Sequence, residues 1–113
     1  MSKFQAALEL YTKELKDKAG VTADADLLKA VTKACGPAIY NEDACRVSTS
    51  DKEELARVKK NFLMKKLGLG DGPALDEAIK EVGEQLGTSN RNKYRAMFYY
   101  LLVKKFGKES MFV

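Results

Sequence analysis

The feature that most constrains the fold is a run of seven apolar or aromatic residues, Met97 to Val103, near the end of the chain. The run is far shorter than the ~20 residues that a helix needs to cross a bilayer. In a helix these residues cover every side, and a helix that is apolar all round is usually buried among others. We therefore expect the last helix to be the central element. The alternative is that one side of it meets a second subunit.

Apolar residues recur at helical spacing in five stretches, each ended by a recognisable stop, and no stretch shows the alternation of a strand. The sequence therefore predicts one all-α domain over residues 1–113, a compact bundle of about five helices around a central C-terminal helix. The expected helices run from about Lys3 to Ala19, from about Ala25 to Cys35, from Ser50 to before Gly68, from Pro73 to before Gly87, and from after Asn90 to about Phe106.

Three local signals support these boundaries. Ser2 is the expected N-cap of the first helix, and Gly20 supplies the left-handed residue that favours a helix end. Ser50 and Glu53 have the spacing of a capping box, so we expect Ser50 to cap the third helix. Pro73 suits the first turn of the fourth helix, where a missing N–H costs little.

The residue inventory argues against an enzyme. The chain has no histidine, which excludes Ser-His-Asp and Cys-His catalysis and histidine metal sites. Cys35 and Cys45 are too few for a disulfide framework and lack the paired spacing of a zinc site, so we expect reduced thiols. We assign no catalytic, cofactor or metal residues. Because no basic-then-apolar leader follows Met1, we expect a cytoplasmic protein without a membrane span.

Three cations, Arg91, Lys93 and Arg95, stand at the expected start of the last helix, where positive charge opposes the helix dipole. A violated local rule can mark a functional site. One hypothesis is that these side chains and free backbone N–H groups bind a phosphate or a nucleic-acid backbone, together with Lys59 and Lys60.

The competing hypothesis is that acidic residues neutralise this basic cluster. Glu81 and Glu84 lie near the end of the fourth helix, where negative charge also opposes the dipole. Each cluster would then compensate the other across the turn at Gly87.

The connection from Gly36 to Ser50 is long, and such loops are often functional or contain a short element. We expect a turn of helix over residues 37–43. The functional candidates are Tyr40, Asn41, Glu42 and Asp43. The alternative interpretation is that Ile39, Tyr40 and Val47 anchor the loop to the core.

Residues 82–89 look like the first helix and turn of a helix-turn-helix motif, but the match then fails. Thr88 and Lys93 stand where that motif usually buries apolar residues. The expected recognition helix continues into the apolar run 97–103, which does not suit a DNA groove. Nucleic acid is therefore a less favoured partner, through a non-specific basic surface at most.

Three segments resemble a small bacterial family that is known only as a domain of unknown function, numbered 2853. They are residues 35–41 (Cys-Gly-Pro-Ala-Ile-Tyr-Asn), residues 58–68, and residues 89–95 continuing into 98–102. The resemblance covers most of the chain. It implies a bacterial cytoplasmic protein and supplies no activity or catalytic residues.

The residue inventory and the apolar residues in excess of one helical face favour a non-enzymatic interaction or scaffold protein. Its partner would be another protein or a second copy, bound through aromatic surface near the last helix and the tail 111–113. The alternative is a weak, non-specific nucleic-acid or anion binder that uses the basic start of the last helix.

Overall fold

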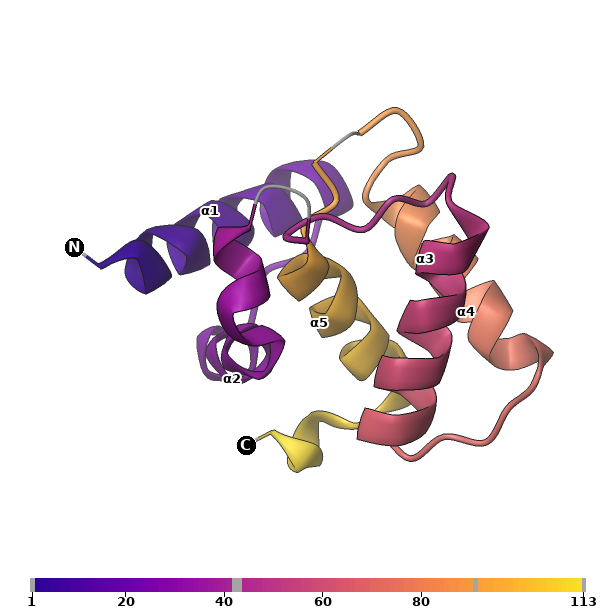
Figure 1. Cartoon of the computed structure of the whole chain (residues 1–113). Coiled ribbons are helices and arrows are strands. Elements are labelled where there is room, and N and C mark those ends of the chain that lie inside the picture. Colours follow the sequence, from indigo (N-terminus) through magenta and orange to yellow (C-terminus); the bar gives the residue numbers. More distant parts are fainter. Residues whose placement is uncertain (1, 42–43, 91, 113) are drawn as a thin grey trace.

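The computed structural model describes residues 2–41, 44–90 and 92–112, and the chain is all-α as expected. Within these residues the only extended pairing is a single antiparallel bridge between Arg46 and Tyr94. The helices, shown in Figure 1, are α1 (Lys3–Ala19), α2 (Ala25–Cys35), the 3-10 helix η1 (Gly36–Tyr40), α3 (Lys52–Arg57), the π-helix η2 (Val58–Lys66), α4 (Pro73–Gln85), α5 (Arg95–Phe106) and the 3-10 helix η3 (Glu109–Met111).

The expectation of a central last helix is confirmed, because α5 lies between α1 and α2 on one side and α3 and α4 on the other (Figure 1). All of Met97 to Val103 is buried except Tyr99, which is half-buried. The Tyr99 ring stacks on Phe62 of η2 with centroids 3.9 Å apart. Other helices of the same chain therefore cover the sides of α5 that were candidates for contact with a second subunit.

Local capping explains where α1 and α2 begin and end. Ser2 accepts a hydrogen bond from the Gln5 amide, and Gly20 ends α1 with a φ of 67°, both as expected. The Asp24 carboxylate caps α2. The Tyr100 hydroxyl of α5 accepts a hydrogen bond from the Asp24 amide at 2.8 Å, which fixes the start of α2 against the central helix.

The expected capping box at Ser50 is wrong, because α3 is capped by the next residue. Asp51 Oδ1 accepts hydrogen bonds from the amides of Glu53 and Glu54 at 2.9 and 3.3 Å. A carboxylate there also meets the positive end of the helix dipole. Ser50 Oγ instead lies 3.3 Å from Ser48 Oγ.

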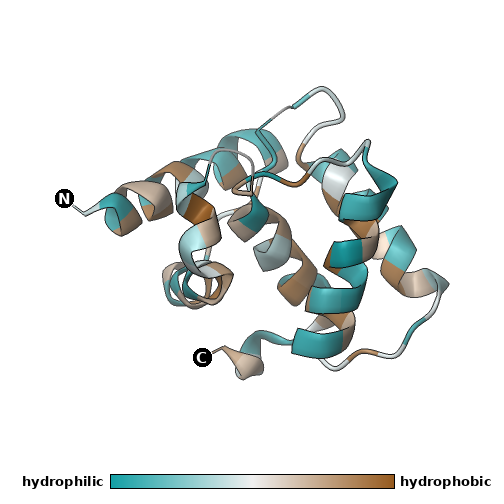
Figure 2. Ribbon diagram, viewed as in Figure 1, coloured by the Kyte–Doolittle hydropathy of each residue, from teal (hydrophilic) through white to brown (hydrophobic). Residues whose placement is uncertain are grey.

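The expected third helix changes winding at its middle. After the six residues of α3, the chain continues as the nine-residue π-helix η2, in which the Leu67 amide donates to the Phe62 carbonyl, five residues back. A π-helix has about 4.4 residues per turn. With this winding, four buried residues lie within an arc of about 80° around the helix axis: Val58, Phe62, Leu63 and Leu67. The viewer's side of α3 and η2 is mostly hydrophilic in Figure 2.

The last helix begins at Arg95, later than expected. The preceding residues pair instead with a distant segment: the Val47 amide donates to the Lys93 carbonyl at 2.8 Å, and the Arg95 amide donates to the Cys45 carbonyl at 2.6 Å. This pairing keeps the chain before α5 extended. Lys93 therefore stands outside the helix, and Arg95 is the cation in its first turn.

Candidate functional site

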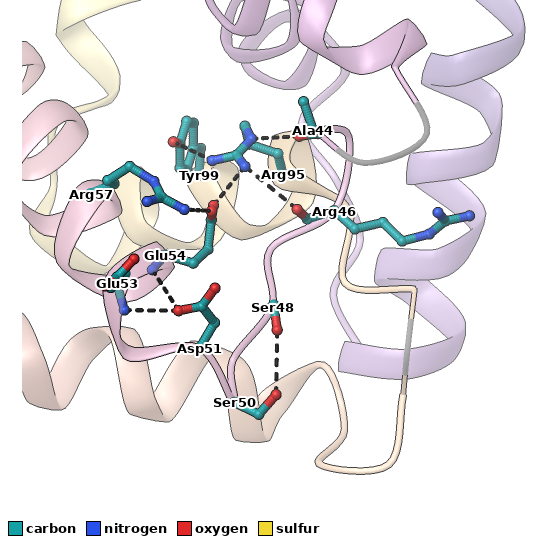
Figure 3. Close-up of polar contacts among 10 residues, drawn as sticks. All are labelled: Ala44, Arg46, Ser48, Ser50, Asp51, Glu53, Glu54, Arg57, Arg95 and Tyr99. Atoms are coloured by element: carbon teal, nitrogen blue, oxygen red, sulfur yellow. Dashed lines mark hydrogen bonds and ion pairs between the residues drawn. The ribbon is translucent and has the colours of Figure 1, made fainter.

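Arg95, a predicted anion ligand, is committed to contacts within the domain (Figure 3). Its guanidinium donates from Nε to the Ala44 carbonyl at 2.7 Å, from Nη1 to the Tyr99 hydroxyl at 3.0 Å, and from Nη2 to Glu54 Oε1 at 2.6 Å. Nη2 also lies 3.5 Å from the Arg46 carbonyl. With 16% of the side chain exposed, this guanidinium has little capacity left for an external anion.

The carboxylate that pairs with Arg95 comes from α3, not from α4. Glu54 lies between two guanidinium groups, since its Oε2 also accepts from Arg57 at 2.8 Å (Figure 3). Burial by itself raises the pKa of the Glu54 carboxyl, but the hydrogen bonds and the positive charges of Arg57 and Arg95 together outweigh burial and lower the pKa. The hypothesis that Glu81 and Glu84 neutralise Arg95 is wrong: Glu81 pairs with Lys105 of α5.

Lys93 is 4% exposed, so it does not present a cation to solvent. Its ammonium donates to the Asn90 carbonyl at 2.6 Å, and burial lowers its pKa. Asn90 also bonds the Leu86 carbonyl with its side-chain amide at 2.9 Å, which holds the turn after α4. Arg91 lies outside the described residues.

Lys59 and Lys60 are not brought to the start of α5. Lys59 bridges two carboxylates, Asp71 at 2.8 Å and Asp76 at 3.0 Å, and so ties η2 to the start of α4. Lys60 is exposed. Arg95, Lys93 and Lys59 therefore each have separate partners within the domain, and Lys60 is exposed elsewhere on η2.

The two described members of the predicted loop site, Tyr40 and Asn41, are both exposed, and Asn41 also has a structural role. Asn41 holds the turn after η1, because its side-chain oxygen accepts from the Ala44 amide at 3.0 Å and its carbonyl accepts from the Cys45 amide at 2.8 Å. Tyr40 is 52% exposed, so it is not a loop anchor, whereas Ile39 and Val47 are buried as expected. Glu42 and Asp43 lie outside the described residues.

Neither Cys35 nor Cys45 forms a disulfide, and Cys35 is not activated. Burial raises the pKa of the Cys35 thiol to about 12, against an opposing effect of the Arg95 charge. A thiol with such a pKa is almost wholly protonated at neutral pH and is a poor nucleophile. This agrees with its position at the end of α2, where the helix dipole opposes a thiolate.

A groove with the shape of a binding site lies between α1 and α2. Its volume is about 390 Å³, and it is lined by Gln5, Leu8, Glu9, Thr12, Lys13, Lys16, Ala25 and Leu28. We call this the α1–α2 groove. Leu28 lies buried at its base and Leu8 is half-buried, so the groove has an apolar floor. The Thr12 hydroxyl is already satisfied by the Leu8 carbonyl at 2.7 Å.

The groove was missed at the level of sequence because it exists only where two helices meet. The apolar stripe of the first helix, which includes Leu8, was assigned wholly to the core. The detectable signal is that Leu8 stands on α1 between the polar residues Gln5, Glu9 and Thr12, which mark the edge of the buried stripe.

None of the helices in the part of the chain that the structure describes combines the length and apolar character of a membrane span. A sequence model of a protein family described as "Protein of unknown function (DUF2853)" matches residues 10–110, which confirms the resemblance seen in the sequence. A search of curated proteins finds no match to the chain.

Proposed function

This chain belongs to the DUF2853 family, a family of unknown function, and from its structure we propose that it is a non-enzymatic protein-interaction domain that binds its partner in the α1–α2 groove. The proposal includes a bacterial cytoplasmic setting, in keeping with two cysteines that form no disulfide. The partner is a different protein, since the aromatic surface of α5 that could have joined two copies is covered by η2 and the other helices.

The main observation in support of this proposal is the α1–α2 groove. Its volume of about 390 Å³ falls within the range of sites that hold ligands, and its floor is apolar with polar groups at the rim. Such a groove suits a partner whose apolar side chains are buried on the floor and whose charged side chains contact the rim.

The basic start of the last helix supports a nucleic-acid or anion function less well. Arg95 is bonded to Glu54, Tyr99 and Ala44, and Lys93 is buried. An external phosphate would have to displace these internal partners, and the largely buried Glu54 carboxylate would lose one of its two guanidinium partners.

The proposal is tested by site-specific photo-crosslinking in cells of the source organism. A photoreactive phenylalanine analogue replaces Gln5 at the groove rim or, as a control, the exposed Glu77 on α4. We expect a defined protein adduct from position 5 and not from position 77. Ala25→Trp, which fills the groove at an exposed helix start, should remove the adduct. An adduct pattern that is the same at both positions, or that persists when the groove is filled, contradicts the proposal.

A further inference from the structure

Taking the proposed function as its premise, we infer that the α1–α2 groove binds an amphipathic helix whose polar edge is acidic. The inference follows from the floor of the groove, the charges along its rim and the side chains that the rest of the molecule exposes.

The floor selects an apolar helix face. Leu28 is 1% exposed and Leu8 is half-buried, and both line the groove with the small side chain of Ala25. A groove with such a floor is suited to a helix that places apolar residues at i, i+3 or i+4 and i+7. The lining of α1 extends from Gln5 to Lys16, a length of roughly 16 Å, which matches about three turns of a partner helix.

The rim selects the charge of the partner. Four residues of the rim follow one another along one edge of α1 at helical spacing: Gln5, Glu9, Lys13 and Lys16. Among the described residues, no ion pair involves Lys13, Lys16 or Glu9. Carboxylates beside the C-terminal half of α1 would therefore meet two unpaired ammonium groups next to an apolar floor.

The same rim gives the partner an orientation. Because Glu9 precedes Lys13 and Lys16, the acidic residues of the partner lie toward the end of α1 that leads into Gly20. Like charges in the reverse orientation would be destabilising, so the rim favours one direction of binding.

A second copy of the chain does not supply such a helix. The large apolar side chains exposed in the described chain are Leu10, Tyr40 and Met111, which belong to α1, η1 and η3. No two of them form the i, i+4 pair that the groove requires. The occupant is therefore a segment of another protein.

The experiment titrates the full-length ¹⁵N-labelled protein with a synthetic 12-residue peptide of leucine at helical spacing and glutamate elsewhere. Two matched peptides replace every glutamate by lysine or every leucine by serine. We expect amide shifts over residues 5–16 and 25–28 with the acidic peptide, and binding at least ~10-fold weaker with either matched peptide. The double variant Lys13→Glu/Lys16→Glu should reverse the preference between the acidic and basic peptides.

The matched control is Lys18→Glu/Lys29→Glu, which reverses two exposed lysines outside the groove. We expect it to change the affinity less than ~2-fold. Equal binding of acidic and basic peptides, or shifts away from the groove, overturns the inference. Concentration-dependent shifts at the groove without peptide would also overturn it, in favour of self-association. If crosslinking from position 5 succeeds while the acidic peptide fails to bind, the partner class is wrong and the interaction function stands.

Discussion

Arg95 connects three parts of the chain that are far apart in sequence. Its guanidinium joins the start of α5 to Glu54 of α3, 41 residues away, and to the Ala44 carbonyl, 51 residues away. Such a fork of donors is the geometry in which arginine differs most from lysine. Arg95, which the sequence suggested as a ligand for an external anion, therefore links these three parts of the chain within the domain.

Replacing Arg95 by alanine should lower the free energy of unfolding by about 2–3 kcal/mol, because Glu54 and the Ala44 carbonyl lose a buried donor. Urea unfolding followed by circular dichroism measures the change. The matched control is Arg57→Ala, which removes the exposed partner of the same carboxylate and should have a much smaller effect. Equal losses of stability in the two variants would contradict this prediction, because the buried contact of Glu54 with Arg95 would then contribute no more than its exposed contact with Arg57.

The lowered pKa of Glu54 predicts how stability responds to acid. The folded state favours the carboxylate, so its contribution is fully present above the ordinary pKa of 4.5 and is lost as the pH falls through the lower folded-state value. Glu54→Gln should therefore be less stable than the natural protein at pH 7 and should lose less stability between pH 5 and pH 2. Urea unfolding across that range measures both. Parallel pH profiles for the two proteins would contradict the assignment.

Single-residue features were predictable from the sequence where they are local. The caps at Ser2 and Gly20 involve neighbours within one or two turns, and both are as expected. The partner of Arg95 was not predictable, because nothing near either residue marks a pairing over such a separation. The nearby Glu81 and Glu84 were chosen on proximity in sequence and proved wrong.

Among the elements, η2 shows how a sequence with an α-like pattern adopts a wider winding. In an α-helix Lys66 would lie on the core side between Phe62 and Leu63, and Leu67 would point away. The π winding brings Leu67 beside Val58 and turns the lysines outward. In the sequence, apolar residues at i, i+4, i+5 and i+9 indicate this wider winding. A search for the 3.6-residue period of an α-helix alone does not detect it.

Because of its wider winding, we expect η2 to tolerate the loss of one residue. Deleting the exposed Lys65 allows an α-helix that still places Leu67 on the core side, so the melting temperature should fall by less than about 5 °C. Deleting the exposed Lys80 of α4 rotates Val82 away from the core and should lower it by more than about 15 °C or prevent cooperative unfolding. Differential scanning calorimetry compares the two. A larger loss from the Lys65 deletion would show that the π winding is needed for another reason.

At the scale of the whole molecule, the exposed large apolar side chains are few and dispersed. Leu10, Tyr40 and Met111 lie on three different elements of the described chain. A stable dimer usually buries about 800 Å² on each partner around an apolar centre. We therefore expect light scattering at ~100 µM to give the mass of a monomer. A dimer mass that Tyr40→Ser converts to a monomer would reveal an interface at η1.

The number of helices and the central place of α5 were predictable from the sequence, because they follow from periodicity and from one run of apolar residues. The α1–α2 groove was not, since it depends on how two amphipathic helices are spaced and not on the pattern of either. The late start of α5 was missed for the same reason: its cause is a pairing with residues 45–47.

That pairing has a consequence for the order in which the chain folds. The bridge between residues 45–47 and 93–95 closes a long loop that contains α3, η2 and α4. Loop closure carries an entropic cost that grows with length, and contacts distant in sequence slow folding. The contact between α1 and α2 is local in sequence and can form early, whereas α5 acquires its N-terminus only when the loop has closed. We expect this closure to set the folding rate.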